Sequence, residues 1–181
     1  MKVLPADLSG VLLIEPDVYP DARGWFFESF NQRHFSDATG LDVRFVQDNI
    51  SHSAKNVVRG LHYQIRQPQG KLVTVLAGEI RDVVVDLRQS SRTFGHWFGV
   101  TLSAENRRQL WVPPGFAHGF AVTGESADVL YKVTDYWAPQ HERCLRWNDP
   151  ALGIDWQLPG AAILSDKDGQ GALLAAAEVF D

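Results

Sequence analysis

The chain has 181 residues, of which 45% are apolar and 22% charged, and its formal net charge is −5. This length predicts one domain, residues 1–181, and the composition is that of a globular chain that can bury its own core. The acidic balance argues against a general affinity for nucleic acid. Cys144 is the only cysteine, so an internal disulfide is excluded.

The N-terminal segment MKVLPADLSG lacks the apolar core of a secretory signal, and no apolar run is long enough to span a bilayer. We therefore expect a cytoplasmic protein that does not enter the membrane. Ten Phe and six Trp favour a sheet-rich interior or a surface that stacks on a ligand.

In chain order, the first helical candidate is Asn31–Gly40, which ends on a glycine able to cap it. Lys71–Leu87 reads as two β-rich runs around a turn at residues 77–79. Further strands are predicted at His96–Ser103, Arg108–Pro114, His118–Gly124 and Asp128–Trp137, separated by Gly, Pro or polar turns. The Ala-rich Gly171–Phe180 is a second helical candidate. Short strands at short intervals predict an all-β sandwich or barrel, in the form of a jelly roll with short peripheral helices.

The strand-like segment Val57–Gln64 is interrupted by Arg59, Gly60 and His62. A histidine here can be structural, but imidazole titrates near neutrality and can also remove a proton. Arg59 can form a surface ion pair or bind a pyrophosphate bidentately. The two side chains are three positions apart, so a regular strand would place them on opposite faces. Either a bulge at Gly60 or an Arg59 that reaches around the rim would bring them together.

Five other clusters carry more polar groups than a core needs: DARGWFFESF (21–30), FVQDN (45–49), PPGFAHGF (113–120), LYKVTDYW (130–137) and LSDKD (164–168). Each is weak evidence alone. In this order, and together with RGLHYQ, they resemble the dTDP-4-dehydrorhamnose 3,5-epimerase family, which belongs to the cupin jelly rolls. The resemblance extends from the first strand to about Gly171.

The resemblance implies a cupin-type jelly roll that epimerises C3 and C5 of dTDP-4-dehydro-6-deoxy-D-glucose. The product would be dTDP-4-dehydro-L-rhamnose, in dTDP-L-rhamnose biosynthesis. Both carbons flank the C4 ketone, so one acid–base site can act on each in turn without a cofactor. The resemblance also implies a homodimer in which the N-terminal strands of one subunit enter the sheet and pocket of its neighbour.

Four catalytic roles follow from the resemblance. His62 would be the general base, oriented by Asp168, because a carboxylate fixes the tautomer of a base histidine. Tyr131 would be the acid, since an unperturbed tyrosine keeps its proton at neutral pH. Lys71 would stabilise the enolate oxygen, without which the hydrogen beside a ketone is not removable. Taken singly, these residues can also be a core histidine, a charged turn, a core aromatic residue and a strand-edge lysine.

The resemblance further implies substrate binding by Arg23, Phe26, Glu28, Gln47, Asn49, Arg59, His118, Trp137, Glu142 and Lys167. One of these roles has independent support, because Tyr131 and Trp137 are an even number of residues apart. In a regular strand they would share a face, with Trp137 placed to stack on a base while Tyr131 meets the sugar. Two core aromatic residues would give the same pattern.

Metal-binding cupins carry a His-x-His pair followed by Glu, whereas here Gln64 occupies the position of the second histidine. Only the later Pro-x-Gly-x-x-His segment, with Pro113, Gly115 and His118, is intact. One half of the ligand set is too little for a closed site, so we predict a metal-free cupin.

Two alternatives remain open. A relative that epimerises one carbon, or that acts on another nucleotide-linked keto sugar, would keep the same base, acid and lysine. A sugar-binding module or a metal-dependent dioxygenase would belong to a different class. The interrupted His-x-His argues against the metal enzyme, and the joint presence of His62, Asp168, Tyr131 and Lys71 argues against an inert module.

Overall fold

The computed structural model describes residues 1–181 and is built mainly of strands, which confirms the predicted all-β class. The strands are β1 (Lys2–Pro5), β2 (Leu12–Glu15), β3 (Val18–Asp21), β4 (Gly24–Phe27), β5 (Gln47–Ala54), β6 (Val58–Gln64), β7 (Lys71–Asp86), β8 (Trp97–Ser103), β9 (Gln109–Val112), β10 (Phe116–Val133) and β11 (Glu142–Cys144). The helices are α1 (Gln32–Thr39) and α2 (Asp166–Gly169), with 3₁₀ turns η1 (Pro139–His141) and η2 (Leu174–Ala176). No helix is long and apolar enough to cross a membrane.

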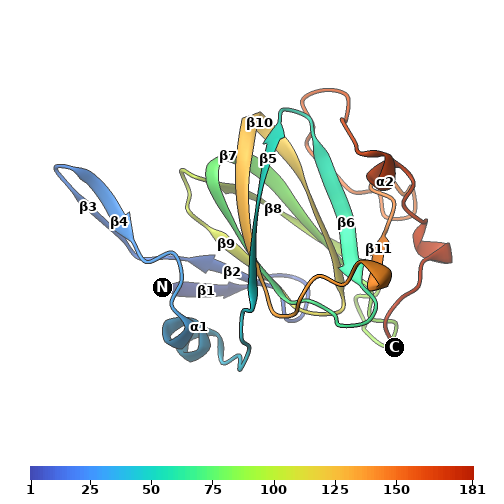
Figure 1. Ribbon diagram of the computed structural model, residues 1–181, viewed down its shortest axis with the longest axis horizontal. Helices are drawn as coiled ribbons and strands as arrows, with labels where there is room; N and C mark the ends of the chain where they lie inside the picture. The colour runs from blue at the N-terminus through green and yellow to red at the C-terminus, as the bar shows by residue number, and fades with distance from the viewer.

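Two long antiparallel strands, β7 and β10, organise the sheet (Figure 1). The first part of β7 pairs with β9 and its second part pairs with β8. Likewise, β10 pairs first with β6 and then with β5. Each long strand therefore pairs with one neighbour along its first part and with another along its second part. The sheet wraps around its core as in a jelly roll.

The predicted turn at residues 77–79 is wrong, because β7 runs continuously through it. The ladder between β7 and β10 shifts its register here instead, between the pairs Val122↔Ile80 and Ala127↔Gly78. Gly78 has φ 74°, and a Cβ on it would lie 1.8 Å from the Ser126 carbonyl oxygen. An irregularity that only glycine accommodates thus lets the strand change neighbours without reversing direction.

Two strands predicted separately, His118–Gly124 and Asp128–Trp137, are both part of β10. This strand ends at Val133, so the expectation that it continues to Trp137 is wrong. Trp137 lies in the loop before η1, and strand alternation does not determine where its side chain points.

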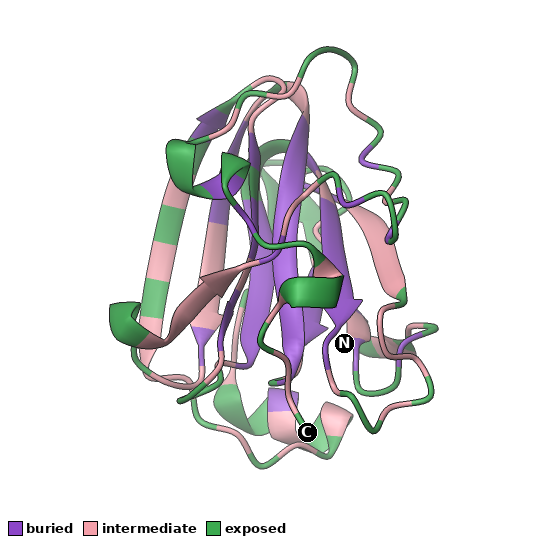
Figure 2. Cartoon of the chain, turned by 90° about the vertical axis from the view of Figure 1, so that its right-hand side faces the viewer, coloured by how far each residue is buried: buried purple, intermediate pink, exposed green.

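The core lies between the layers, along the central strands, while helices and loops carry most of the exposed residues (Figure 2). One cluster contains residues of β7, β9 and β10, including Val73, Leu110 and Val129. A second, including Leu61 and Val85, packs beneath the C-terminal segment. Both parts of β7 are buried almost continuously because other chain segments cover both faces.

The helix predicted over residues 31–40 is confirmed as α1. The Asn31 side chain accepts hydrogen bonds from the backbone N–H groups of Arg33 and His34, and Gly40 closes the helix with φ 71°. Buried Phe35 anchors the helix to the barrel.

The predicted helix Gly171–Phe180 is wrong, since only η2 is helical there. Phe180 instead donates its N–H to Leu87 O at 3.0 Å and accepts from Gln89 N at 2.7 Å. Pairing with the segment that follows β7, and packing of Leu174 and Phe180 on the core, outweigh the helical propensity of the alanines. Helix α2 was not predicted from the sequence, and the Ser165 side chain caps it by accepting from Asp168 N.

The hairpin of β3 and β4 forms a separate two-stranded sheet that projects from the body (Figure 1). It exposes large apolar side chains, with Tyr19, Trp25 and Phe26 at 61%, 56% and 67% exposure. Such side chains are costly to leave in water, which marks the hairpin as a candidate contact surface.

Candidate active site

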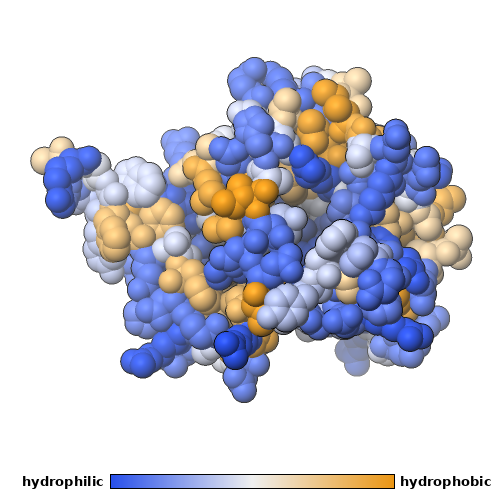
Figure 3. Space-filling model, viewed as in Figure 1, coloured by the Kyte–Doolittle hydropathy of each residue, from blue (hydrophilic) through white to orange (hydrophobic).

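A pocket of about 320 Å³ opens beside β5, β6 and β10. The face of the molecule shown in Figure 3 is mainly hydrophilic, with separate apolar patches. The pocket gathers residues from five strands and two loops, although they are far apart in sequence. The predicted site residues that line it are Gln47, Asn49, Arg59, His62, Lys71, His118, Tyr131, Trp137 and Glu142.

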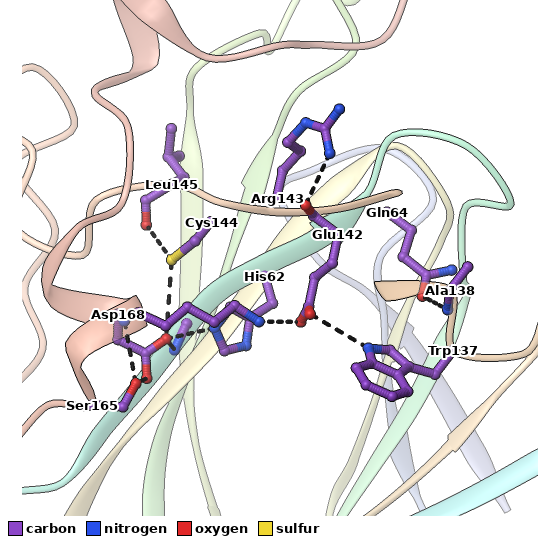
Figure 4. Close-up of polar contacts among 12 residues, drawn as sticks. His62, Gln64, Trp137, Ala138, Glu142, Arg143, Cys144, Leu145, Ser165 and Asp168 are labelled. Atoms are coloured by element: carbon purple, nitrogen blue, oxygen red, sulfur yellow. Dashed lines mark hydrogen bonds and ion pairs between the residues drawn. The ribbon is translucent and has the colours of Figure 1, made fainter. Parts of the chain in front are cut away.

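His62 and Asp168 form the closest polar contact in the pocket wall, with Nε2 and Oδ1 2.5 Å apart (Figure 4). The His62 side chain is 29% exposed, whereas that of Asp168 is 6% exposed. Burial opposes ionisation of Asp168, but hydrogen bonds from His62, Ser165 and Gly60 hold its pKa below the ordinary value. The charged carboxylate accepts the Nε2 proton, which leaves the lone pair on Nδ1 available to take a proton.

A β-bulge at Gly60 brings Arg59 and His62 to the same pocket. In the ladder with β10, His118 pairs with His62 and Phe120 with Arg59, so two steps on one strand match three on the other. Gly60 has φ 108°, and a Cβ on it would lie 2.7 Å from the Cα of Gly119. Of the two arrangements left open by the sequence, the structure therefore has the bulge.

Arg59 is held at the pocket edge by hydrogen bonds from Nε to Ser53 Oγ at 2.8 Å and from its NH2 group to His52 O at 3.1 Å. The residue itself is exposed. Its guanidinium is thus oriented without being neutralised by a carboxylate, which suits it to bind an anion.

Lys71 is buried, with 8% exposure, and its Nζ donates to the backbone oxygen of His62 at 3.2 Å. Burial lowers its pKa from 10.5 to about 8, against the opposing charges of Glu142 and Asp82. A cation kept beside the histidine in this way is placed to stabilise negative charge formed in the pocket.

Tyr131 also lines the pocket, and burial raises the pKa of its phenol. The Arg59 charge partly offsets this effect. The hydroxyl is therefore protonated at neutral pH and is able to donate a proton.

A second histidine–carboxylate pair joins His118 and Asp82, with Nε2 3.0 Å from both carboxylate oxygens. Both residues are buried. His118 also lines the pocket, so the pair presents an oriented imidazole to it.

At the pocket mouth, Trp137 Nε1 donates to Glu142 Oε2 at 3.4 Å, and Glu142 Oε1 pairs with Lys167 Nζ at 2.6 Å (Figure 4). Burial raises the pKa of Glu142, but the Lys167 contact outweighs it and lowers the pKa below its ordinary value. Gln47 accepts from Trp137 N at 3.1 Å and donates to Asn49 Oδ1 at 2.8 Å. Tyr131 and Trp137 do share one pocket, but a loop rather than strand alternation brings them together.

Three predicted site residues lie away from this pocket. Arg23 sits in the projecting hairpin, with its side chain 90% exposed and paired with Asp21. Phe26 is exposed on β4. Glu28 is hydrogen-bonded to Asn31 and to His34 Nδ1, the latter at 2.7 Å. Their own chain does not bring them to the site.

His62, Cys144 and Asp168 could share a metal ion, because their ligand atoms lie within 4.8 Å of one another. The donor set is already engaged, however. Asp168 accepts from His62, and burial together with the Asp168 charge raises the pKa of the Cys144 thiol to about 12. A protonated thiol beside a satisfied pair fits a dyad better than a resident metal.

Two supporting residues were missed at the sequence level. Asp82 follows Glu79 and Arg81 in β7, so it reads in the sequence as part of a charged stretch, and nothing there marks it as buried. Ser165 caps α2 and also donates to Asp168 Oδ2 at 2.8 Å, but nothing in the letters LSDKD distinguishes it from an ordinary loop serine.

The pocket combines a carboxylate-oriented imidazole, a protonated phenol and a buried ammonium group. Together with the jelly roll, these groups define an enzyme that transfers protons to and from carbon, within the isomerase class.

Comparisons with known proteins agree. Residues 5–176 match the family model described as dTDP-4-dehydrorhamnose 3,5-epimerase. The chain is 59% identical to the dTDP-4-dehydrorhamnose 3,5-epimerase of Pseudomonas aeruginosa over 180 residues, which covers 99% of each. Its structure superposes on a Legionella pneumophila dTDP-6-deoxy-D-glucose-3,5-epimerase in complex with dTDP-4-keto-L-rhamnose, with TM-score 0.95, 50% identity, and 98% and 94% of the two chains covered. It also superposes on a Streptomyces bikiniensis 3'-monoepimerase in complex with dTDP-quinovose, with TM-score 0.90, 33% identity, and 98% and 89% covered.

The chain belongs to the dTDP-4-dehydrorhamnose 3,5-epimerase family. The cupin-type jelly roll implied by the sequence resemblance is confirmed by the same structural matches.

Proposed function

We propose that this protein epimerises C3 and C5 of dTDP-4-dehydro-6-deoxy-D-glucose to give dTDP-4-dehydro-L-rhamnose, in the biosynthesis of dTDP-L-rhamnose. The observation that carries the proposal is the contact between His62 and Asp168 in the wall of a polar pocket. A cytoplasmic location belongs to the proposal, because the substrate is a nucleotide sugar and Cys144 is a free thiol.

In the proposed mechanism, His62 removes the hydrogen from the carbon beside the C4 ketone, and the bonding electrons move onto the C4 oxygen. Lys71 stabilises the resulting enolate. Tyr131 then donates its proton to the carbon from the opposite face, which inverts the centre. The imidazolium loses its proton to solvent and the phenolate regains one, so the site is ready for the second carbon.

The anionic part of the substrate is its pyrophosphate group, and we propose that Arg59 binds this group, with His118 nearby. Trp137 would stack on the thymine base. Its exposed ring stands at the pocket mouth, where Glu142 and Lys167 complete the rim. Gln47 and Asn49 would hydrogen-bond the substrate from β5.

The proposed active form is a homodimer in which the β3–β4 hairpin enters the neighbouring subunit. Two features support this. The hairpin exposes apolar side chains, and Arg23, Phe26 and Glu28 do not line the pocket of their own chain. These residues would then bind the substrate held by the partner.

Subunit complementation tests the exchange. A His62→Asn chain and an Arg23→Ala/Phe26→Ala chain should each be inactive alone but regain activity when refolded together. In a mixed dimer, one pocket would combine an intact base with an intact hairpin, so about a quarter of wild-type activity is expected at equal mixing. If each hairpin serves its own chain, mixing restores nothing.

The activity itself is tested by proton NMR of the dTDP-keto sugar in heavy water with purified protein. Deuterium at both C3 and C5, with inversion, is the expected result. Exchange at C3 alone would make the protein a monoepimerase, which keeps the same acid–base groups. Binding without exchange would make it a sugar-nucleotide-binding module and would overturn the proposal.

A further inference from the structure

Gln64 is a buried residue at the end of β6, and each polar atom of its side chain bonds to backbone. Its Nε2 donates to Gln67 O at 2.8 Å and to Tyr136 O at 3.2 Å. Its Oε1 accepts from Ala138 N at 2.8 Å (Figure 4). Only an amide meets this demand for two donors and an acceptor on one planar group.

These bonds hold the backbone immediately before and after Trp137. That control matters because β10 has ended at Val133, and the indole, 59% exposed, has little packing of its own. The Trp137 N–H is itself bound by Gln47. Three consecutive backbone positions are therefore fixed by two glutamine side chains, one of which is fully inside the protein.

We propose that Gln64 is a positioning residue for nucleobase recognition, acting through the loop that carries Trp137. The inference rests on the proposed stacking role of Trp137. A ring held in its binding position loses less conformational freedom when the base arrives, so the fixed loop contributes affinity without touching the ligand. Substitution at Gln64 should therefore weaken the binding of the base-containing part of the substrate and leave the chemistry largely intact.

The same residue could be merely structural, and two substitutions separate the possibilities. Gln64→Glu keeps the shape but sets a carboxylate oxygen against the carbonyls of Gln67 and Tyr136. Gln64→Met keeps the length and burial but removes all three bonds. Because two chemically different changes release the same loop, failure of one variant to fold leaves the other as a test, with thermal melts identifying the folded one.

The measurements are calorimetric titrations with dTDP and with inorganic pyrophosphate, together with kcat and KM for the keto sugar. Trp137→Ala should bind dTDP roughly ten- to a hundred-fold more weakly, as expected for loss of a base–aromatic stack. Each Gln64 variant should lose roughly three- to thirty-fold, never more than Trp137→Ala. Its KM should rise accordingly, with kcat and the affinity for pyrophosphate within about three-fold of wild type.

The control is Gln69→Leu, which removes a bond to the same loop at Asp135 O, 2.8 Å away, but does not touch the residues flanking Trp137. Its loss of dTDP affinity should be smaller than that of Gln64→Met. An equal loss would mean that general loosening of the loop, rather than the bonds flanking Trp137, is responsible.

The double variant Gln64→Met/Trp137→Ala distinguishes failure of this inference from failure of the proposed function. If Gln64 acts through Trp137, the double variant binds dTDP as weakly as Trp137→Ala alone. Additive losses, or equal weakening of pyrophosphate binding, would overturn the positioning role while leaving the stacking role intact. Unchanged dTDP binding in Trp137→Ala would instead remove the stacking role on which the inference rests.

Discussion

The two histidine–aspartate pairs of this protein are neighbours in space but differ in their surroundings. His62 and His118 pair directly across β6 and β10. His62 has 29% of its side chain exposed and takes its carboxylate from α2, 106 residues away. His118 has 8% exposed, and Asp82, on the adjacent strand β7, is completely buried.

The difference separates two uses of one side-chain combination. A proton-transferring imidazole must reach both substrate and solvent, which fits His62. The imidazole of His118 is buried and lies within hydrogen-bond distance of both carboxylate oxygens of Asp82. Such a ring is better suited to present a fixed N–H or charge to an anionic ligand. The same combination of a histidine and an aspartate therefore has a different role at each of the two positions.

The largest expected effect is the loss of kcat when His62 is substituted, compared with the same substitution at His118. His62→Asn should lower kcat by roughly 10²–10⁴-fold, the usual contribution of a general base, because asparagine cannot take the proton. His118→Asn keeps a hydrogen-bonding group and should act mainly on KM. Steady-state kinetics decides between them, and comparable losses of kcat in both variants would erase the proposed distinction.

A smaller effect concerns Lys71, which lies beside both pairs. Burial costs the folded protein stability wherever the ammonium is charged, because its folded pKa of about 8 lies below the unfolded value of 10.5. The unfolded state therefore binds more protons between these values, so the penalty is complete below about pH 8 and fades as the pH rises toward 10.5.

Lys71→Met should consequently raise the free energy of unfolding at pH 7 by on the order of 1–3 kcal/mol, while kcat falls because the enolate loses its charge partner. In the wild type, kcat/KM should fall above about pH 8 as Lys71 loses its charge. Denaturant unfolding and a pH–rate profile measure the two effects. A less stable Lys71→Met variant, or a profile flat to pH 10, would contradict the proposed role of the lysine.

The smallest expected effect is that of chelation. Prolonged EDTA treatment should leave turnover unchanged, because the donor atoms near His62 are engaged as a hydrogen-bonded dyad. Activity assays with metal analysis before and after treatment provide the test. Loss of turnover that a divalent ion restores would show that the interrupted His-x-His was misinterpreted.

Local signals in the sequence were sufficient where the structure is locally determined. The caps Asn31 and Gly40 lie within the segment they terminate, and α1 was predicted correctly. The bulge at Gly60 was foreseen as one of two solutions, because the spacing of Arg59 and His62 demanded an irregularity.

Where distant segments decide, the sequence pattern failed. The alanines of residues 171–180 favour a helix, but hydrogen bonds that join Phe180 to Leu87 and Gln89, just after β7, give an extended chain. Trp137 was placed by alternation along a strand that stops at Val133. The partnership of Asp168 with His62 came from family resemblance alone, since no rule of spacing connects residues so far apart in sequence.

The assignment of His62 as the base and Tyr131 as the acid is tested most directly by isotope exchange in heavy water, measured together with product formation for each variant. Tyr131→Phe keeps the base and Lys71, so deuterium should enter C3 or C5 with little net inversion. His62→Asn should show neither exchange nor inversion. If His62→Asn exchanges at the wild-type rate while Tyr131→Phe does not exchange, the assignment of base and acid is wrong.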